Sequence, residues 1–566
     1  MWESSGKNGF SQVGICPDIL AVDDAGNCFY TGALRGDSIH FGSYTLRNNA
    51  VNSFDIFLVK FDNNGKVVWA KQSQQNGNST DINGYVVSTD GMGNAYIMAN
   101  FSDTMSFDSY ILKTQQEDTA NQGYYQDNFL VKYAPDGKVV WARQSQVPSM
   151  TSVVFGNSLA TDREGNSCIV GTFFDTIKFG AETLIGPING ATYTFLVKYD
   201  ANGNVKWAKQ STGHSSSGSF GQSVAANNIG GVFIAGFFYD SLTFGSFKLN
   251  SPPSAGDVFL VKYDTSGNVK WARQGIIPSS HNIAQPKGIT ADRFGNVYVA
   301  GYFWNTLIFG QYTLTDPNPN AYNTNVFIVK YDANGNVKWA KAATMLDNNG
   351  WSATDLSCDN KGEVFMSGSG GGNKFCKICF GTDTLSIIDT ANFDLPSFIV
   401  KYDSSGNVLC ASIIPCGGNG NSPDGMASDT SGNYVYLGGT AETTGIFGND
   451  TVTPYEGIQP TPFIARWREC EPTLGVPELE IENGAEVKVY PNPNNGNFTL
   501  EYDLGKGANG YVQLYNTMGQ MVGEYNLANS QGKMSISNPQ LSNGVYIWKL
   551  FSNNQPLKYG KVIIMK

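Results

Sequence analysis

The strongest constraint on the fold of this chain is a phrase that it repeats. Residues 197–211 read VKYDANGNVKWAKQS, and residues 329–341 read VKYDANGNVKWAK. Related phrases, the last of them cut short, begin at Phe57, Phe129, Phe195, Phe259, Phe327, Phe398 and Phe463. The steps between these residues are 72, 66, 64, 68, 71 and 65. Self-similarity at a nearly fixed period predicts a repeat architecture, in which the phrase is a building unit.

A second motif lies between the copies of this phrase and also returns seven times. It centres on a Gly-Asn turn with two degenerate forms, and the residue four places earlier is acidic in every unit but one. We number the units one to seven by that residue, which is Asp23, Asp90, Asp162, Asn227, Asp292, Asp359 or Asp429. A large apolar residue and then a small residue precede it by three and two positions. The whole unit therefore repeats, and not the phrase alone.

The residues of each unit predict strands. Segments such as VFIVKYD and NVKWAKAA are short, rich in β-branched and aromatic residues, and bounded by Asn, Asp and Gly. No stretch shows a sustained apolar period of 3.6 residues. The DxxGN turn places Gly where a tight hairpin needs a left-handed residue. Each unit therefore predicts a meander of about four strands, which is the size of a propeller blade.

We expect the N-terminal strand to close a ring of seven blades. The seventh unit ends at FIARW, its third strand, and no fourth strand follows. Trp2 fits the position that is held in other units by Trp69, Trp141, Trp207, Trp271 and Trp339. The first residues are therefore predicted to supply the missing outer strand of the seventh blade. A closed ring also removes the exposed sheet edges that invite aggregation.

These units resemble the bacterial seven-bladed propeller repeats known as SBBP repeats. The resemblance covers residues 1–468 and rests on the NVYVAGYF strand, the FGQYTL element at Phe309 and the phrase VKYDANGNVKWAK. It implies an all-β fold, a seven-bladed β-propeller with four-stranded blades, and it implies fold more than activity. Unit six departs most from the pattern, with extra residues around Cys376 and Cys379 and with Cys410 in the Trp position.

The composition is that of an extracellular β-protein. Charged residues make up 15% and aromatic residues 13% of the 566 residues, and 65 are Gly. The net charge of −11 argues against nucleic acid as a partner, because phosphate binding needs a basic patch. No apolar run reaches membrane-spanning length, so no transmembrane segment is expected. No signal peptide is present either, and we expect Met1 to stand where a removed one ended.

Two recurring features admit both a functional and a structural interpretation. The lysines at one strand position could form an anion-binding ring, or could pack their stems and extend the ammonium group to solvent; they are Lys60, Lys132, Lys198, Lys262, Lys330 and Lys401, with Arg466. The strand position favours packing. The CKIC sequence at 376–379 could be a metal half-site or a redox motif. Since no second pair accompanies it, a local disulfide or buried thiols are favoured, and one of the nine cysteines stays unpaired if the rest pair.

The composition changes after Cys470. Residues 469–486 are acidic, contain Pro and lack the repeat register, so they predict a linker. Residues 487–566 alternate as strands with Gly and Asn turns, which predicts a small β-sandwich.

This last segment resembles the type A sorting domain of the type IX secretion system. The positions that match are Tyr490, Pro491, Asn492, Pro493, Gly519, Gly544, Val545, Tyr546, Lys561 and Lys566. The resemblance implies that the type IX machinery is a partner through residues 487–566. It further implies passage through the periplasm and across an outer membrane, then cleavage and either surface attachment or release. A plain accessory sandwich is the alternative.

Signs of catalysis are sparse. The sequence has no phosphate-binding Gly-rich loop, no G-x-S-x-G elbow, no H-E-x-x-H motif and only three His. The DANGN segments look like fragments of a calcium loop but do not continue to the Glu that a full loop requires. We therefore predict no catalytic residues, no metal and no cofactor.

The connections opposite the tight turns are long and differ between units, and variable loops on a rigid scaffold are where binding usually resides. Their aromatic and amide side chains suit a glycan or a peptide. The predicted ligand-binding residues are Tyr124, Tyr125, His214, His281, Trp304 and Trp351. The predicted function is a secreted or cell-surface, non-catalytic binding or adhesion propeller. The alternative is a secreted hydrolase or lyase, with Asp81, Asp127, Asp347 and Asp424 as available carboxylates.

Overall fold

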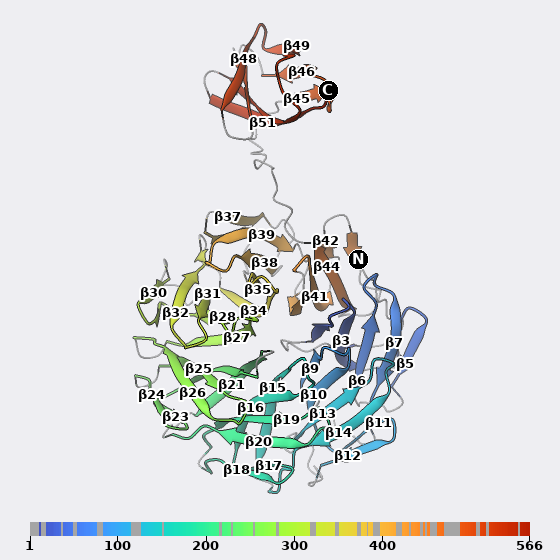
Figure 1. Cartoon of the computed structure of the whole chain (residues 1–566), viewed down its shortest axis with the longest axis vertical. Helices are drawn as coiled ribbons and strands as arrows, with labels where there is room; N and C mark the ends of the chain where they lie inside the picture. The colour runs from blue at the N-terminus through green and yellow to red at the C-terminus, as the bar shows by residue number, and fades with distance from the viewer. Residues whose placement is uncertain are drawn as a thin grey trace. The chain divides into compact units, whose positions relative to one another are not determined.

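The computed structural model is all-β: every regular element among the residues that it describes is a strand. The chain divides into two compact parts, Met1–Glu469 and Cys470–Lys566, which hold strands β1–β44 and β45–β51 (Figure 1). The described residues are 11–12, 19–34, 38–48, 54–75, 83–114, 126–149, 152–188, 190–213, 218–227, 230–252, 255–278, 282–316, 324–345, 350–370, 375–381, 383–388, 397–414, 422–429, 432–441, 445–447, 450–452, 461–468, 487–504, 510–516, 520–552 and 555–566. The expected linker at 469–486 lies outside them.

Most repeat units form one antiparallel sheet of four strands, as the sequence predicts for a blade. In unit five the order is β27 (Ala284–Ala291), β28 (Val297–Phe303), β31 (Asn325–Tyr331) and β32 (Val337–Ala342). The same order recurs in units two, three, four and six, whose strands are β9 (Asn83–Thr89), β10 (Ala95–Phe101), β13 (Asp127–Tyr133) and β14 (Val139–Gln144); β15 (Val153–Thr161), β16 (Ser167–Phe174), β19 (Tyr193–Tyr199) and β20 (Val205–Gln210); β21 (Ser219–Ala226), β22 (Val232–Phe238), β25 (Asp257–Tyr263) and β26 (Val269–Gly275); and β34 (Trp351–Cys358), β35 (Val364–Gly370), β38 (Ser397–Tyr402) and β39 (Val408–Ile414).

The first and seventh units differ in their inner and outer strands. In unit one both β1 (Ser11–Gln12) and β2 (Leu20–Val22) pair with β3 (Cys28–Leu34), which is followed by β6 (Asp55–Phe61) and β7 (Val67–Gln72). The described strands of unit seven are β40 (Ser422–Ser428), β41 (Tyr434–Ala441) and β44 (Thr461–Arg468). The N-terminal strand that we expect beside β44, with Trp2, falls on residues 1–10 and so lies outside the described residues.

Each unit also carries a small hairpin that the four-strand prediction did not include. In unit five it is β29 (Thr306–Phe309) with β30 (Tyr312–Thr315), and the FGQYTL element forms its turn, with Gly310 at a φ of 57°. Phe309 is fully buried, with its ring 5.4 Å from the ring of Phe327. The other hairpins are β4 (Ser38–Phe41) with β5 (Tyr44–Arg47), β11 (Thr104–Phe107) with β12 (Tyr110–Lys113), β17 (Thr176–Phe179) with β18 (Glu182–Ile185), β23 (Ser241–Phe244) with β24 (Phe247–Asn250), β36 (Phe375–Phe380) with β37 (Asp383–Ile388), and β42 (Gly445–Phe447) with β43 (Asp450–Val452).

The sheets pack against one another through their first strands. β2, β9, β15, β21, β27, β34 and β40 contact each other in that order, and β40 also contacts β2 (Figure 1). The buried core lies between the sheets: one cluster joins Tyr436 and Ile464 of unit seven to residues of units one and two. Segments far apart in the sequence are therefore neighbours in this part of the molecule.

A repeated hydrogen bond joins each unit to the next. The fourth-strand Trp donates its indole N–H to a carbonyl in the following unit's second turn, at 3.0–3.2 Å in the pairs Trp69–Pro135, Trp141–Ala201, Trp207–Thr265, Trp271–Ala333 and Trp339–Ser404. A related contact crosses from unit seven to unit one, where Arg466 Nη1 donates to the carbonyl of Asn63 at 2.7 Å. The hydroxyl of Tyr30 in unit one also donates to the carbonyl of Gly439 in unit seven, at 3.2 Å.

The second part of the chain consists of two antiparallel sheets. One contains β45 (Val487–Tyr490), β46 (Asn497–Asp503) and β49 (Gln531–Ser537), and the other contains β48 (Met521–Leu527), β47 (Gly510–Tyr515), β50 (Gly544–Ser552) and β51 (Gln555–Ile564). Leu500 from the first sheet and Leu514 from the second belong to one buried cluster. The alternation of buried and exposed side chains along β46 follows from this single covered face.

Candidate functional site

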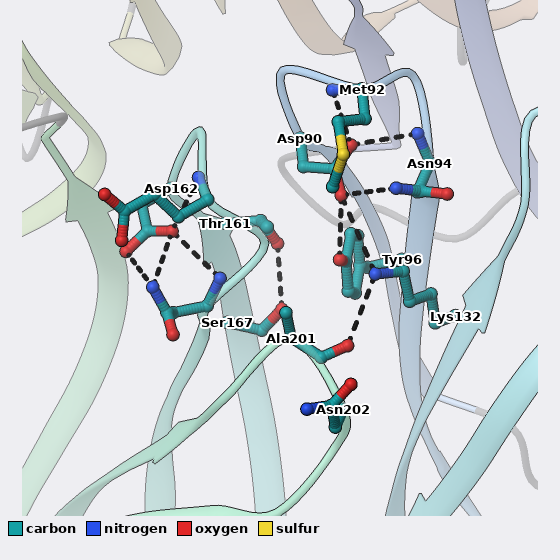
Figure 2. A network of polar contacts seen from close by, with 12 residues as sticks. Asp90, Met92, Asn94, Tyr96, Lys132, Thr161, Asp162, Ser167, Ala201 and Asn202 are labelled. Carbon is teal, nitrogen blue, oxygen red and sulfur yellow. Dashed lines mark hydrogen bonds and ion pairs between the residues drawn. The ribbon is translucent and has the colours of Figure 1, made fainter.

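The repeated acidic residue organises the first turn of each unit, as Figure 2 shows for unit two. Asp90 Oδ1 accepts hydrogen bonds from the backbone amides of Met92 and Asn94, at 2.9 and 3.0 Å. Its Oδ2 accepts from Asn94 Nδ2 at 2.7 Å and from the Tyr96 hydroxyl at 2.9 Å. Both carboxylate oxygens thus serve the turn. In the DANGN segment at 200–204, Asp200 Oδ1 likewise accepts from the backbone amides of Asn202 and Asn204, which favours the turn interpretation over a calcium loop.

The repeated lysine lies beside this carboxylate. Lys132 Nζ is 3.8 Å from Asp90 Oδ2 and 5.0 Å from the centre of the Tyr96 ring, and it donates to the carbonyl of Ala201 in the next unit at 3.3 Å (Figure 2). Burial lowers the pKa of Lys132, and the Asp90 charge opposes that shift. Comparable ion pairs join Lys60 to Asp23, Lys198 to Asp162 and Lys401 to Glu363.

The packed-stem interpretation expected the ammonium groups of these lysines to reach solvent, and it is wrong on that point. In the four ion pairs the lysine side chains are only 1–9% exposed. A carboxylate, an aromatic face and a turn carbonyl replace water around the ammonium, so its desolvation is offset inside the protein. These lysines therefore join neighbouring units instead of forming an open cationic surface.

A second set of carboxylates is buried at the start of the third strand. Asp127, one of the carboxylates available to a hydrolase, is 1% exposed and accepts from Gln144 Nε2 at 3.2 Å. Burial raises its pKa to about 7, against the hydrogen bonds that it accepts. Asp55 and Asp257 hold the same position in units one and four, with pKa values raised by burial to about 6. A carboxylate that recurs between units and binds the following loop is a structural group.

Little else in the described residues offers catalysis or metal binding. Asp81, Asp347 and the side chain of Asp424 lie outside those residues. Within them, no group of three or more His, Cys, Asp or Glu side chains is arranged to hold a metal ion. Cys410 is disulfide-bonded, and Cys168 is a buried thiol whose pKa burial raises to about 12.

The structure describes two of the six predicted ligand-binding residues. Tyr124, Tyr125, His214 and His281 lie outside the described residues. Trp351 is 1% exposed in β34 and packs in the core, with its ring 6.0 Å from that of Phe398. A ring that is covered in this way cannot stack on a ligand. Trp304 follows β28 at the long-loop end, is half-buried, and its indole N–H has no hydrogen-bond partner in the described structure.

A group of aromatic side chains that the prediction missed lies near Trp304, at the long-loop ends of units four and five. The rings of Phe220 and Phe237 stack with their centres 4.7 Å apart, and the ring of Tyr239 meets Phe237 edge-on at 6.0 Å. Lys287 Nζ lies 5.6 Å from the centre of the Tyr302 ring. We call Phe220, Phe237, Tyr239, Lys287, Tyr302 and Trp304 the aromatic cluster.

Two units contribute to the aromatic cluster and are held together beneath it. Ser223 of β21 donates its hydroxyl to the carbonyl of Lys287 in β27. Burial raises the pKa of Tyr302, and the charge of Tyr239 in unit four raises it further. Burial also lowers the pKa of Lys287. The arrangement offers partly covered rings, phenol hydroxyls and one cation, which can stack on a ligand and hydrogen-bond to it. The indole N–H of Trp304 is itself covered.

The sequence did contain a signal for this cluster. The residue directly after the small residue of the second strand is Ala33, Asn100, Thr172, Phe237, Tyr302 or Ser369 in units one to six. Two places further along stand Arg35, Ser102, Phe174, Tyr239, Trp304 and Gly371. Units four and five are the ones with aromatic residues at both places. The informative residues are those that depart from the repeat at these two places, whereas the prediction relied mainly on the variable loops.

The tail motif has a structural role in the second part of the chain. Asn492 Oδ1 accepts from the backbone amide of Ile563 at 2.7 Å, and its Nδ2 donates to the carbonyl of Lys561 at 3.2 Å. The peptide bonds that precede Pro491 and Pro493 are both cis.

The remaining tail residues that the structure describes lie in β45, at the start of β50 and at or after the end of β51. Gly544 has a φ of 155° at the start of β50, and Val545 follows it. The hydroxyl of Tyr546 donates to the carbonyl of Ser542, and Lys566 donates to the carbonyl of Pro539. Tyr490 is 39% exposed and donates to Glu501 Oε2 at 2.9 Å. Gly519 lies outside the described residues.

Comparison with known families confirms both resemblances. Residues 270–308 match the family model of the β-propeller repeat (SBBP), and residues 488–565 match that of the secretion system C-terminal sorting domain. The sorting-domain match supports export by the type IX secretion system. No described residues form a helix with the length and apolarity needed to cross a bilayer.

Matches to individual proteins say less about this chain than the two family matches do. The chain is 24% identical over 339 residues to an uncharacterized WD repeat-containing protein of Acanthamoeba polyphaga mimivirus, a match that covers 50% of this chain and 24% of that protein's length. Among solved structures it is similar to the extracellular domain of a one-component system protein from B. thetaiotaomicron, with 12% identity, coverage of 100% and 99% of the two chains and a TM-score of 0.15. It is also similar to dimeric latent PorU from Porphyromonas gingivalis, with 9% identity, coverage of 61% and 32%, and a TM-score of 0.14.

Proposed function

We propose that this chain, which carries a β-propeller repeat and a secretion sorting domain, is an exported, non-catalytic binding protein that recognises a glycan or a peptide. Its ligand would lie on the long-loop face of a seven-bladed propeller, against the aromatic cluster. The observation that carries the proposal is that Tyr239, Tyr302 and Trp304 stay partly exposed at the ends of adjacent units, with Lys287 over the ring of Tyr302. Aromatic and cationic groups of this kind are typical anchors of binding surfaces.

A closed seven-bladed ring is part of this proposal. It is supported by the succession of first strands that returns from β40 to β2 and by the bond from Arg466 to Asn63, which repeats between the last and first units the contact made between other neighbours. The N-terminal strand with Trp2 would complete the outer edge of the seventh blade. A rigid ring of this kind holds loops from several units around one axis, which suits convergent binding.

Binding is favoured over a secreted hydrolase or lyase. Hydrolysis needs a carboxylate or another base that faces the substrate. Asp127 is instead covered, accepts hydrogen bonds from its own unit and recurs as Asp55 and Asp257. The aromatic cluster contains no carboxylate among its named residues.

The tail would act as a separable export domain, and the protein would reach the cell surface or the medium through it. Deleting residues 487–566 should leave a folded repeat part that stays in the periplasm, because the two parts have separate buried cores. Cell fractionation with an antibody to the repeat part measures this. Export of the truncated protein at the normal level would contradict the proposed role of the tail.

The ligand proposal is tested by binding of the purified protein to a glycan array and a peptide library, followed by variants. Tyr302→Ala and Trp304→Ala should weaken binding of any hit by about 2 kcal/mol, as expected for aromatic anchors. Asn204→Ala, in a tight turn at the opposite ends of the strands, is the matched control and should bind normally. If the control abolishes binding while both cluster variants bind as the wild type does, the proposed face is wrong. Turnover of a hit by the wild type would favour the hydrolase alternative.

A further inference from the structure

Unit four departs from the repeat at its first turn. Where units two, three and five have an Asp and, four places later, an Asn, unit four has Asn227 and Gly231. The turn itself is preserved, because Asn227 Oδ1 still accepts from the backbone amide of Gly231 at 2.8 Å. What unit four has lost is one negative charge and one side chain.

Unit three shows what those two groups normally do. Asn166 Nδ2 donates to Asp162 Oδ2 at 2.9 Å, and Lys198 Nζ lies 3.7 Å from the same oxygen. The carboxylate of Asp162 therefore accepts a hydrogen bond from Asn166 and forms an ion pair with Lys198 at the same time. In unit four the corresponding lysine is Lys262, and no carboxylate of the described residues lies within ion-pairing distance of it.

The donors of unit four consequently lack a carboxylate acceptor. Asn227 is 3% exposed, and its Nδ2 has no hydrogen-bond partner in the described structure. Lys262 Nζ donates one hydrogen bond, to the carbonyl of Ala333 at 2.9 Å, and lies 5.2 Å from the centre of the Phe233 ring. The carboxylate that raises the pKa of Lys262 is Asp332 of the next unit. In unit five, by contrast, the charge of Asp292 in the same unit raises the pKa of Lys330.

A pocket of about 600 Å³ lies beside this turn. Gly230, Gly231, Lys262 and Phe247 line it, together with Lys270 and Arg273 of β26. A Cβ built on Gly231 would lie 3.3 Å from Asn227 Nδ2, so a side chain at 231 would fill the space in front of that amide. The volume is in the range of small-molecule sites.

We propose that this pocket binds an acidic, monosaccharide-sized ligand through one carboxylate or phosphate group. The anionic group would lie beside Gly231, where units two, three and five carry an Asn side chain, and accept from Lys262 Nζ. It would supply the negative charge that unit four lacks at position 227. Lys262, Lys270 and Arg273 give the lining three positive charges against the one negative charge of Asp264. The Phe247 ring and the bare glycine backbone leave room for the body of the ligand. This site is separate from the aromatic cluster and does not depend on the function proposed for it.

The proposal is tested by calorimetric titration of the full chain with D-glucuronate, glucose 6-phosphate and inorganic phosphate, with neutral glucose as the reference. At least one of the two sugar acids should bind, and glucose should not. Binding of glucuronate alone, or of glucose 6-phosphate alone, identifies a carboxylate or a phosphate as the preferred group. Equal binding of glucose, or binding of neither sugar acid, overturns the proposal.

A variant that restores the repeat gives the sharper test. Asn227→Asp combined with Gly231→Asn introduces the pair that units two, three and five fold with. It should place a side chain in the pocket next to Lys262 and give that lysine an ion-pair partner. Affinity for the sugar acids should fall about tenfold or more, which is the effect of losing a charged hydrogen bond. Unchanged affinity in this variant contradicts the site, even if the wild type binds.

The matched control makes the reverse change in unit three, with Asp162→Asn combined with Asn166→Gly. This variant should keep the wild-type affinity at unit four and show a second, weaker binding event. Tyr302→Ala should leave sugar-acid binding unchanged, so a failure of this inference can be told apart from a failure of the proposed long-loop face. Loss of sugar-acid binding in Tyr302→Ala would assign the binding to the aromatic cluster and overturn the pocket.

Discussion

At the residue scale, burial decides the chemistry of Asp127. Its carboxyl has an ordinary pKa of 3.8, which burial raises to about 7 in the folded chain. Between these two values the folded state holds more protons than the unfolded chain. The contribution of Asp127 to the free energy of unfolding should therefore be largest at low pH and fall as the pH rises through this window, by about 1.4 kcal/mol for each unit of pKa difference.

Asp127→Asn removes the titration while keeping the shape of the side chain. We expect the free energy of unfolding of the variant to depend less on pH between about pH 3.8 and pH 7, the two pKa values of Asp127. Urea unfolding at several pH values in that window measures this. Asp55 and Asp257 should retain their own share, because their pKa values are raised in the same direction. Identical pH profiles for the variant and the wild type would show that Asp127 stays ionised in the fold.

Two tryptophans that looked alike in the sequence should respond differently to truncation. Trp351 is 1% exposed within a buried cluster, so Trp351→Ala should cost about 3–5 kcal/mol of stability through the cavity that it leaves. Trp304 is only half-buried, so Trp304→Ala should cost clearly less. Chemical unfolding of both variants checks the order, and a larger loss for Trp304→Ala would be inconsistent with their burial.

At the element scale, the tight turns show how much the repeat dictates. Gly26 and Gly203 both have a φ of 79°, but a Cβ at Gly26 would be 3.5 Å from its nearest neighbour, whereas one at Gly203 would be 2.8 Å from the Trp141 ring. Gly26→Ala should therefore lose about 1 kcal/mol through its backbone conformation alone. Gly203→Ala should lose more, because it also disturbs the bond from Trp141 to the next unit.

The comparison is made by urea unfolding of the two variants at one pH. Since the two glycines share one backbone angle, the difference between the variants isolates the contact with Trp141. Equal losses in stability would mean that the Trp ring moves aside without cost, and that the bond between units contributes little.

The elements were largely predictable from the sequence, because they rest on local signals. The alternation in VFIVKYD and the Gly of each DxxGN turn are sufficient for the four-stranded sheets. The hairpin at Phe309 was not anticipated, since FGQYTL is too short to read as two strands and depends on Phe309 packing against Phe327. The burial of Trp351 and the grouping of Tyr239 with Tyr302 depend on how the sheets pack, which pattern alone does not give.

On the scale of the whole molecule, neighbouring units are joined by a repeated hydrogen bond from a Trp indole to a turn carbonyl of the next unit. Arg466 supplies the corresponding contact from the last unit to the first. Its guanidinium donates to the Asn63 carbonyl and lies 4.6 Å from the centre of the Tyr434 ring. Arg466→Ala should lower the stability of the repeat part by about 1 kcal/mol, the usual net value of such a bond.

Arg163→Ala provides the control for that variant. Arg163 pairs with Asp24 at the surface, where its side chain is 61% exposed, and such pairs contribute little. Differential scanning calorimetry of both variants measures the effect. If Arg163→Ala lowers the unfolding temperature more than Arg466→Ala does, the contact between units seven and one is not important for stability.

The bond from Tyr30 to Gly439 joins residues that are 409 positions apart, and this separation has a consequence for the order of assembly. Closing a flexible loop of that length has an entropic free-energy cost of roughly 5 kcal/mol, which the contacts between the two units must offset. Units two to six each pack between two neighbours that are close in the sequence. Unit one has one such neighbour, unit two, and its other neighbour, unit seven, is distant in the sequence. Within the repeat part, β2 and β3 of unit one therefore keep an open flank until unit seven has folded against them. Proteolysis during refolding should cut there first.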